Sequence, residues 1–303
     1  MKEFEFPSKG AGMIHAYRWE PEGAPVAVVQ LVHGIAEYMP RYDDFAKFLT
    51  SKGALVVAED HMGHGKSHGS GADLYFAGGW TAALEDTDTL QRITREEYPD
   101  LPFFLFGHSM GSFMARSMLY RYPDANLRGA IICGTAWQPG AVLAAGRAIC
   151  GIETKRLGEK NRSKLVTKLM FGSYNVKFGK HPRTPNDWIC SREDVVDRYT
   201  EDPLCGGAPT LGLSRDMLSG IAMNQKKKNL DAMPKELPVL LIAGKSDPVG
   251  AMGKGVEKTY QKFKAAGMRD VTLKLYDGRH EILNEDNHAA VYADIWDFIE
   301  KHL

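Results

Sequence analysis

The chain of 303 residues has few features that would tie it to a membrane, to nucleic acid or to an oxidising compartment. Its four cysteines form no Cys-x-x-Cys pair, which favours buried, reduced thiols over disulfides. The formal net charge is zero, so the molecule as a whole is not built to attract nucleic acid. No apolar run approaches roughly 18 residues, and the charged start MKEFEFPSKG lacks the apolar segment of a signal peptide. We therefore expect a cytoplasmic protein without a membrane span.

What the chain does contain is a regular alternation of short apolar runs and helix-length amphipathic stretches. Apolar residues make up 44% of it and charged residues 25%, as is ordinary for a globular protein with a large core. Residues 2–20 alternate around a glycine-containing turn and predict a β-hairpin. The predicted buried strands are 26–32, 54–58, 103–106, 130–133, 239–243 and 271–276, and the predicted helices include 42–51, 80–98, 256–266 and 289–302. This alternation predicts an α/β fold with a mostly parallel sheet flanked by helices on both faces.

Residues 135–237 interrupt the alternation between two of the predicted strands. Their pattern is mainly helical, and basic residues outnumber acidic ones. The helices predicted there are 142–148, 163–171, 193–199 and 215–224. An insertion of this length over the edge of a sheet is usually a lid or cap that forms one wall of a substrate pocket. We therefore expect a core of residues 1–134 and 238–303, with a helical cap inserted at 135–237.

The most informative motif is GHSMG at 107–111, which matches Gly-x-Ser-x-Gly. The predicted strand 103–106 precedes it, and a helical pattern begins at Met110. In such a turn the serine backbone is strained, so small residues are needed two positions before and two after it. The turn raises the hydroxyl above the sheet edge, beside helix N-terminal N–H groups that stabilise negative charge. Ser109 is therefore predicted to be a nucleophile, with a buried helix-capping serine as the alternative.

Other matches to known motifs fail on their context. The segment GKSHG at 65–69 fits the same pattern, but no strand precedes it and no helix follows it. The same loop lacks the first glycine of a phosphate-binding P-loop, because Asp60 stands at that position. The spacing of His61, His64 and His68 suggests a metal site only weakly, since the loop is rich in glycine. We therefore expect neither a metal nor a cofactor.

A serine nucleophile needs a base, and the base needs an acid to orient it. After an elbow of this kind the acid follows a later strand and the histidine follows the next one. Asp247 and His280 follow two successive predicted strands, at the carboxyl ends where open α/β sheets place their sites. Asp277 is too close to His280 in the chain to orient it, and His288 begins the last helix. The alternative is a turn-forming aspartate and an unrelated loop histidine.

The groups that would stabilise an oxyanion are predicted to be two backbone N–H groups. One belongs to Met110, directly after the proposed nucleophile. The other comes from the loop after an early strand, where Gly34 lets the backbone turn close to a substrate and Ile35 is the assigned donor. His33 precedes this loop and is expected to hold it by hydrogen bonds rather than to act as a base.

With these residues placed, the chain resembles the α/β-hydrolase superfamily along nearly its whole length. More narrowly it is similar to the monoacylglycerol lipase and lysophospholipase branch, which is grouped with serine aminopeptidase (S33)-like hydrolases. The stretches that carry the resemblance are HGIAEYMPRYDDFAKFL at 33–49, DHMGHGKS at 60–67, GHSMGS at 107–112, SDPVG at 246–250 and GRHE at 278–281. The resemblance implies a catalytic triad of Ser109, Asp247 and His280. It also implies an oxyanion hole formed by the Ile35 and Met110 amides and a cap that admits an acyl chain.

Two positions depart from the pattern of this branch, whose members commonly have glycine at the position of Ala36 and arginine at that of Met62. Both lie in loops, and neither touches the predicted triad. The cap is the least diagnostic region, so the substrate is inferred less directly than the reaction.

The expected reaction is hydrolysis of carboxylic esters through an acyl-enzyme, with an acyl ester or lipid as the substrate. Apolar cap residues favour a monoacyl lipid or a medium-chain ester; they are Val142, Leu143, Leu165, Leu169, Met170 and Phe171. The basic residues within 155–168 are either a solvated face or a contact for a phosphate head group or an anionic membrane surface.

Three further functions fit the same residues to different degrees. Thioester cleavage or acyl transfer would use the same triad with another leaving group or acceptor. A non-catalytic ligand-binding member of the fold typically lacks a triad residue, whereas this chain keeps all three. Aminopeptidase action lacks an acidic cluster in the cap that would bind a substrate amine. Ser109 excludes the dehalogenases and epoxide hydrolases, which carry an acid at the elbow. The sequence leaves the oligomeric state open.

Overall fold

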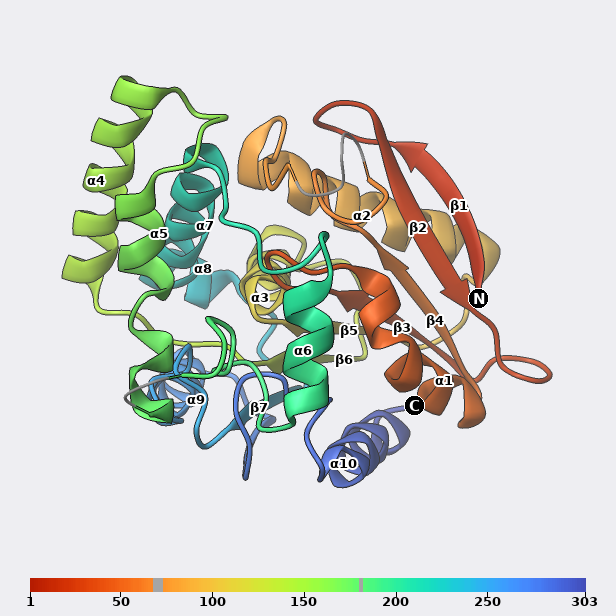
Figure 1. The fold of residues 1–303 in the computed structure, drawn as a ribbon. Coiled ribbons are helices and arrows are strands. Elements are labelled where there is room, and N and C mark those ends of the chain that lie inside the picture. Colours follow the sequence, from red (N-terminus) through yellow and green to blue (C-terminus); the bar gives the residue numbers. More distant parts are fainter. Residues whose placement is uncertain (68–72, 180–181) are drawn as a thin grey trace.

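The computed structural model describes residues 1–67, 73–179 and 182–303, and its centre is a single eight-stranded sheet (Figure 1). The strand order is β1-β2-β4-β3-β5-β6-β7-β8. Only the pairs β1–β2 and β2–β4 are antiparallel, so the prediction of a mostly parallel sheet is confirmed. The strands are β1 (Lys2–Pro7), β2 (Met13–Trp19), β3 (Ala27–Val32), β4 (Ala54–Glu59), β5 (Phe103–His108), β6 (Gly129–Cys133), β7 (Val239–Gly244) and β8 (Val271–Tyr276).

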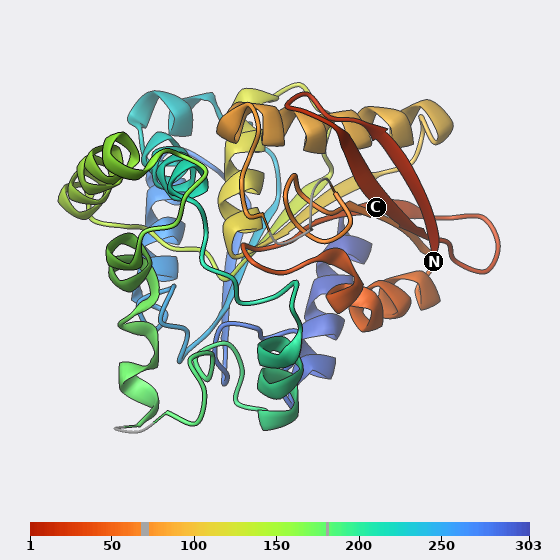
Figure 2. The same ribbon diagram turned by 45° about the horizontal axis from the view of Figure 1, so that its top comes forward.

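Helices cover both faces of this sheet, as Figure 2 shows. On one face lie α1 (Asp43–Ser51) and α10 (His288–Lys301), and on the other lie α2 (Gly79–Glu97), α3 (Met110–Arg121) and α9 (Lys254–Ala265). Strand β3 shows why two cores form, because successive side chains of a strand point to opposite faces. Val28 and Val32 pack with α2 and α3, whereas Val29 and Leu31 pack with α1 and α10. Both faces are therefore apolar, which explains the continuous apolar runs in the sequence.

The segment between β6 and β7 contains most of the remaining helices. They are α4 (Gly140–Leu157), α5 (Lys164–Phe171), η2 (Tyr174–Phe178), α6 (Glu193–Glu201), α7 (Leu211–Asn224) and α8 (Lys227–Ala232). The predicted end of the first of these helices at 148 is wrong, since α4 runs on through Gly151 and ends only before Gly158, which has a φ of +87°. The short helix α8 was not predicted, because its lysine-rich sequence buries little apolar surface.

This segment is attached to the core mainly through α7, which packs against α2, α3 and α4. Leu213, Met217 and Ile221 of α7 belong to the same apolar cluster as α2 and α3. By contrast, α6 has a small cluster of its own around Val195 and Val196. The inserted helices therefore differ in their support, because the buried residues of α5 and α6 belong to small clusters outside the main core.

Two further expectations concern the membrane and the cysteines. Within the described residues, no helix combines the length and apolarity needed to cross a bilayer. Cys133, Cys150, Cys190 and Cys205 are all free and buried, as predicted.

Candidate active site

Ser109 lies in a tight turn between β5 and α3, and its backbone has the strained combination of φ +54° and ψ −119°. Its N–H donates to the carbonyl of Cys133, 3.0 Å away, which ties the turn to β6. A Cβ at Gly107 would clash with the carbonyl of Gly111, and a Cβ at Gly111 would clash with the carbonyl of Val32. The two glycines of the motif are thus required by close backbone packing, and the strain raises the partly exposed Ser109 above the sheet edge.

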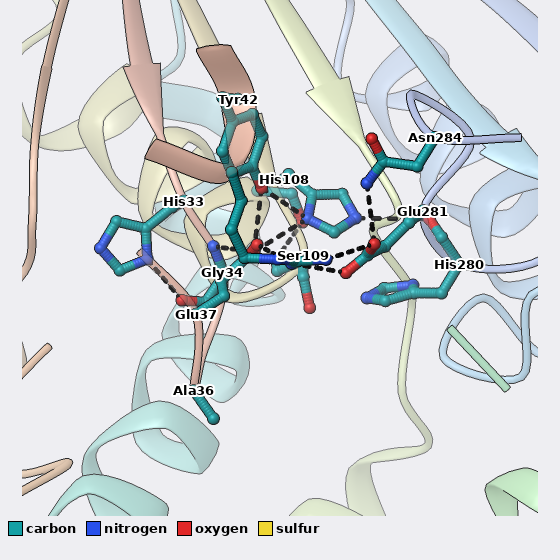
Figure 3. A network of polar contacts seen from close by, with 12 residues as sticks. His33, Gly34, Ala36, Glu37, Tyr42, His108, Ser109, His280, Glu281 and Asn284 are labelled. Carbon is teal, nitrogen blue, oxygen red and sulfur yellow. Dashed lines mark hydrogen bonds and ion pairs between the residues drawn. The ribbon is translucent and has the colours of Figure 1, made fainter. Parts of the chain in front are cut away.

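Asp247 and His280 form a buried pair at the same edge of the sheet. Asp247 Oδ2 lies 2.9 Å from His280 Nδ1, and Oδ1 of the same carboxylate accepts the Val249 N–H at 2.8 Å. A carboxylate accepts only, so Nδ1 carries the proton and Nε2 of the neutral ring is free to accept one. Nε2 is buried and has no hydrogen-bond partner among the described residues. Figure 3 shows the ring directed toward the side chain of Ser109.

A cavity of about 630 Å³ brings Ser109 and His280 together with the inserted helices. Its lining residues come from both the core loops and the segment between β6 and β7. Trp188 of that segment packs against His280, with 5.1 Å between the ring centroids. In addition, the Glu281 N–H donates to the carbonyl of Ile189 at 2.6 Å. The inserted segment is therefore bound to the loop that carries the histidine.

The two predicted oxyanion donors flank Ser109. Met110 begins α3, Ile35 lines the cavity, and neither backbone N–H donates to another group within the described parts of the chain. A Cβ at Gly34 would lie 2.9 Å from Ser109 Cβ and would clash with the carboxylate of Glu37. The loop therefore passes close enough to the serine that only glycine fits there.

Ala36, the position where the related branch commonly has glycine, adopts a φ of +55°. This left-handed conformation is unfavourable for alanine. Its carbonyl accepts two hydrogen bonds of 3.0 Å, one from the hydroxyl of Tyr199 and one from the N–H of Gly206. Both donors belong to the inserted segment, which therefore holds the loop that carries Ile35.

The histidines near this loop form a buried, hydrogen-bonded group. His33 Nε2 accepts the His61 N–H at 3.0 Å, and its Nδ1 donates to the carbonyl of Gly34 at 2.7 Å. Burial lowers the pKa of all three rings, that of His64 to about 3, so they stay neutral. The described residues contain no metal-binding cluster, and His68 lies outside them. These rings therefore support the loop.

The remaining residues considered from the sequence have structural contacts. Ser67 is buried and donates to the carbonyl of Asp60 at 2.6 Å. Asp277 forms an exposed ion pair with Lys245 at 2.8 Å. His288 Nδ1 donates to the carbonyl of Glu285 at 2.7 Å. None of these three side chains lines the cavity of Ser109 and His280.

A network of charged residues beside the predicted triad was not expected from the sequence (Figure 3). Arg41 bonds both carboxylate oxygens of Glu281 and one of Glu37, each at 2.8 Å. Glu37 also accepts the Gly34 N–H at 2.6 Å and the Tyr42 hydroxyl at 2.9 Å. Burial alone would raise the pKa of Glu37, but the hydrogen bond from His108 and the charges of His108 and Arg41 hold it well below its ordinary value. The network joins the loops after β3 and β8 to the last residue of β5.

Sequence reasoning missed the network because the contacts that close it, Arg41 with Glu281 and His108 with Glu37, join residues far apart in the chain. The available signal was the presence of charged residues inside the stretches HGIAE at 33–37 and GRHE at 278–281, where apolar or small residues would otherwise be expected in buried loops.

Known proteins provide an independent comparison. A family model described as serine aminopeptidase, S33, matches residues 23–287, a span that includes the elbow, the insertion and both later loops. Monoglyceride lipase of Mus musculus is 29% identical over 88% of this chain and 79% of its own length. Monoacylglycerol lipase of Mycolicibacterium smegmatis is 28% identical over 99% of this chain and 98% of its own length.

Solved structures give the same picture of the fold. A highly thermostable carboxyl esterase from Bacillus coagulans, in complex with glycerol, has a TM-score of 0.92 at 30% identity and covers 99% of this chain and 98% of that chain. A soluble variant of monoglyceride lipase from Saccharomyces cerevisiae has a TM-score of 0.79 over 99% of this chain and 94% of that chain. Its identity of 18% makes the likeness one of fold alone.

Proposed function

Because this chain belongs to the serine aminopeptidase S33 family of α/β hydrolases, we propose that it hydrolyses carboxylic esters, and monoacylglycerols in particular, through a covalent acyl-enzyme. The observation that carries the proposal is that the strained Ser109 and the buried His280 line the same cavity, and that Asp247 holds Nδ1 of the His280 ring. A serine, a base and an orienting acid in this relation are the parts of an acyl-transfer site.

In the proposed mechanism Ser109 Oγ attacks the ester carbonyl carbon while its proton moves to His280 Nε2. Asp247 stabilises the imidazolium, and the Ile35 and Met110 amides stabilise the oxyanion. When the tetrahedral intermediate collapses, His280 returns the proton to the leaving alkoxide and the acyl group stays on Ser109. A water molecule then gives a proton to His280 and attacks the acyl-enzyme, which releases the acid and restores the serine hydroxyl.

A fluorophosphonate probe tests the nucleophile directly. Labelling is expected at Ser109 in the wild type and not in Ser109→Ala, with kcat falling by at least about 10³. Ser67→Ala is the matched control, because Ser67 belongs to the second copy of the sequence motif and lines no part of the cavity. Equal labelling of Ser109→Ala and wild type would refute the assignment.

The cavity supports an ester substrate over a peptide amine. Its volume suits a small molecule, and Phe171, Trp188 and Ile189 provide apolar lining for an acyl chain. Among the described lining residues the only carboxylates are Glu37 and Glu281, and both are already ion-paired with Arg41. A substrate ammonium group therefore finds no available anionic partner there.

The proposal also concerns which molecule accepts the acyl group and which head group the substrate carries. Lys164 and Lys168 on α5 line the cavity, which favours a lysophospholipid beside the neutral monoacylglycerol. Thioester cleavage and acyl transfer on the same residues are separated from ester hydrolysis by product analysis with competing alcohols. A binding protein without catalysis would leave all p-nitrophenyl esters intact. A panel of these esters of graded length, with monoacylglycerols and lysophospholipids, tests substrate and reaction together.

We also propose that residues 135–237 act as a cap that meets a lipid surface transiently. Large apolar side chains are exposed on α4, α5 and η2; they are Val142, Ile152, Leu157, Leu165, Leu169 and Val176. Basic residues lie on the same helices, so an anionic interface would attract this face and the apolar side chains would enter it. Cosedimentation with phosphatidylglycerol vesicles is expected to weaken in Leu165→Ser/Leu169→Ser, whereas hydrolysis of short soluble esters persists. Unchanged cosedimentation of this variant would contradict the proposed contact.

The proposed location is the cytoplasm, which the four buried free thiols support.

A further inference from the structure

His108, the residue directly before Ser109, makes contacts on both sides of its ring. Nε2 lies 3.3 Å from the backbone carbonyl of His280. Nδ1 lies 2.9 Å from the hydroxyl of Tyr42 and 3.2 Å from Oε1 of Glu37. The ring is buried, so these protein groups are its partners.

The partners determine where protons must be. A carbonyl oxygen only accepts, so Nε2 of His108 carries a hydrogen. On the other side, Tyr42 has one hydroxyl proton, and it is donated to Glu37 Oε1 at 2.9 Å. The hydroxyl oxygen and the carboxylate then both accept, so Nδ1 carries a hydrogen as well. A bare Nδ1 would place a lone pair against the Glu37 carboxylate.

The charge balance of the buried network leads to the same state. Glu37 and Glu281 bring two negative charges, and Arg41 brings one positive charge. A doubly protonated His108 supplies the second positive charge, so that the cluster is neutral. Burial alone would lower the pKa of His108, but the hydrogen bond and charge of Glu37, together with the charge of Glu281, raise it above its ordinary value.

We propose that His108 is a buried imidazolium that positions the two halves of the proposed active site, by joining Glu37 of the oxyanion loop to the backbone of His280. This inference rests on the proposed ester hydrolysis. His108 does not touch the reacting atoms in this scheme, so it is a positioning residue.

The same charge acts on the proposed base, because the ring centroids of His108 and His280 are 4.7 Å apart. A protonated His108 therefore places a positive charge beside the ring that Asp247 orients.

The ionisable groups that face His108 come from each element packed around it. They are His33 and Glu37 after β3, Arg41 and Tyr42 of η1 (Met39–Tyr42), Cys133 of β6, Tyr199 of α6, His280 and Glu281 after β8, and Tyr292 of α10. Burial raises the pKa of Cys133 and of the three tyrosines and lowers that of His33, so these groups stay neutral near pH 7. The charges that govern His108 are therefore those of Glu37, Arg41 and Glu281.

The charge is measured directly by NMR of the full chain labelled with 15N-histidine. At pH 7 the His108 ring is expected to show the imidazolium pattern, with both nitrogens protonated, and Glu37→Gln is expected to convert it to a neutral ring. The signal is assigned by its loss in His108→Gln, or in the wild type by backbone-to-ring correlation if that variant does not fold. A neutral His108 ring in the wild type at pH 7 overturns the proposal, and this readout does not depend on any activity.

The kinetic arm follows kcat and KM with a soluble p-nitrophenyl ester. In His108→Gln kcat is expected to fall about tenfold with KM within about twofold, because the reacting groups are misplaced while the cavity stays intact. His15→Gln, on the outer hairpin, is the matched control and should leave kcat and KM unchanged. A folded His108→Gln with the kcat of the wild type overturns the positioning role. If the wild type hydrolyses no ester, the proposed function fails while the NMR result still decides the charge.

Discussion

The buried carboxyl group of Glu59 gives the protein a pH-dependent stability that one substitution should remove. Glu59 ends β4, is fully buried, and accepts a hydrogen bond of 2.7 Å from Thr87. Burial and the nearby charges of Asp86 and Asp60 raise its pKa from 4.5 to about 8. Between these values the native state holds a proton that the unfolded chain has released, so stability falls as pH rises. The contribution of the protonated Glu59 carboxyl group to the free energy of unfolding is fully present below pH 4.5 and is lost as pH rises through 8. At about 1.4 kcal/mol per pH unit, this contribution amounts to about 5 kcal/mol.

Glu59→Gln keeps the size of the side chain and the acceptor for Thr87 but has no ionisable proton. Its stability relative to the wild type should therefore increase by up to about 4 kcal/mol between pH 5 and pH 8, as measured by urea unfolding monitored by circular dichroism. Glu96→Gln, an exposed substitution of the same kind on α2, should follow the wild type throughout. If Glu59→Gln and the wild type show the same pH dependence to within about 0.5 kcal/mol, the carboxyl group is not protonated in the native state near neutral pH, and the reasoning is wrong.

Three further predictions address the site. In Gly34→Ala the added Cβ would lie 2.9 Å from Ser109 Cβ, so ester turnover should fall more than about 100-fold while circular dichroism remains native-like; near-wild-type kcat would contradict the close approach. In Tyr199→Phe the Ala36 carbonyl loses one of its two donors, so we expect about 1 kcal/mol less stability and a several-fold lower kcat, with unchanged kcat showing that the contact does not act on the loop. Lys164→Gln/Lys168→Gln should reduce turnover of a lysophospholipid and spare the neutral monoacylglycerol, and equal losses on both would remove the role of the two charges.

Strands β3 to β7 were predictable because they are buried on both faces and therefore appear as unbroken apolar runs. The edge strand β8 is mostly half-buried, and its place beside β7 brings His280 to Asp247. The GHSMG motif at 107–111 was equally informative, because any side chain at its two glycines would clash with backbone atoms that pack against this turn. Local sequence thus carries information wherever local sterics decide the conformation.

The inserted helices and the charged network were less predictable, since long-range contacts decide both. Helix α4 continues past a glycine because α7 packs along it, which no local pattern reveals. Arg41 and Glu281 are 240 positions apart, and their bidentate pair exists only once the loops after β3 and β8 meet. The role of an ionisable residue in a buried loop can be inferred only when its partners are known.

The pair of hydrogen bonds that Tyr199 and Gly206 donate to Ala36 has a consequence for how such enzymes change. Exchanging the helical segment for one from a relative would replace not only the proposed substrate entrance but also the support of the loop that carries Ile35, a proposed oxyanion donor. A chimera of this kind should alter turnover even for a small ester that never meets the exchanged surface. Under the proposed function, substrate range and catalytic rate would therefore change together when this segment is exchanged.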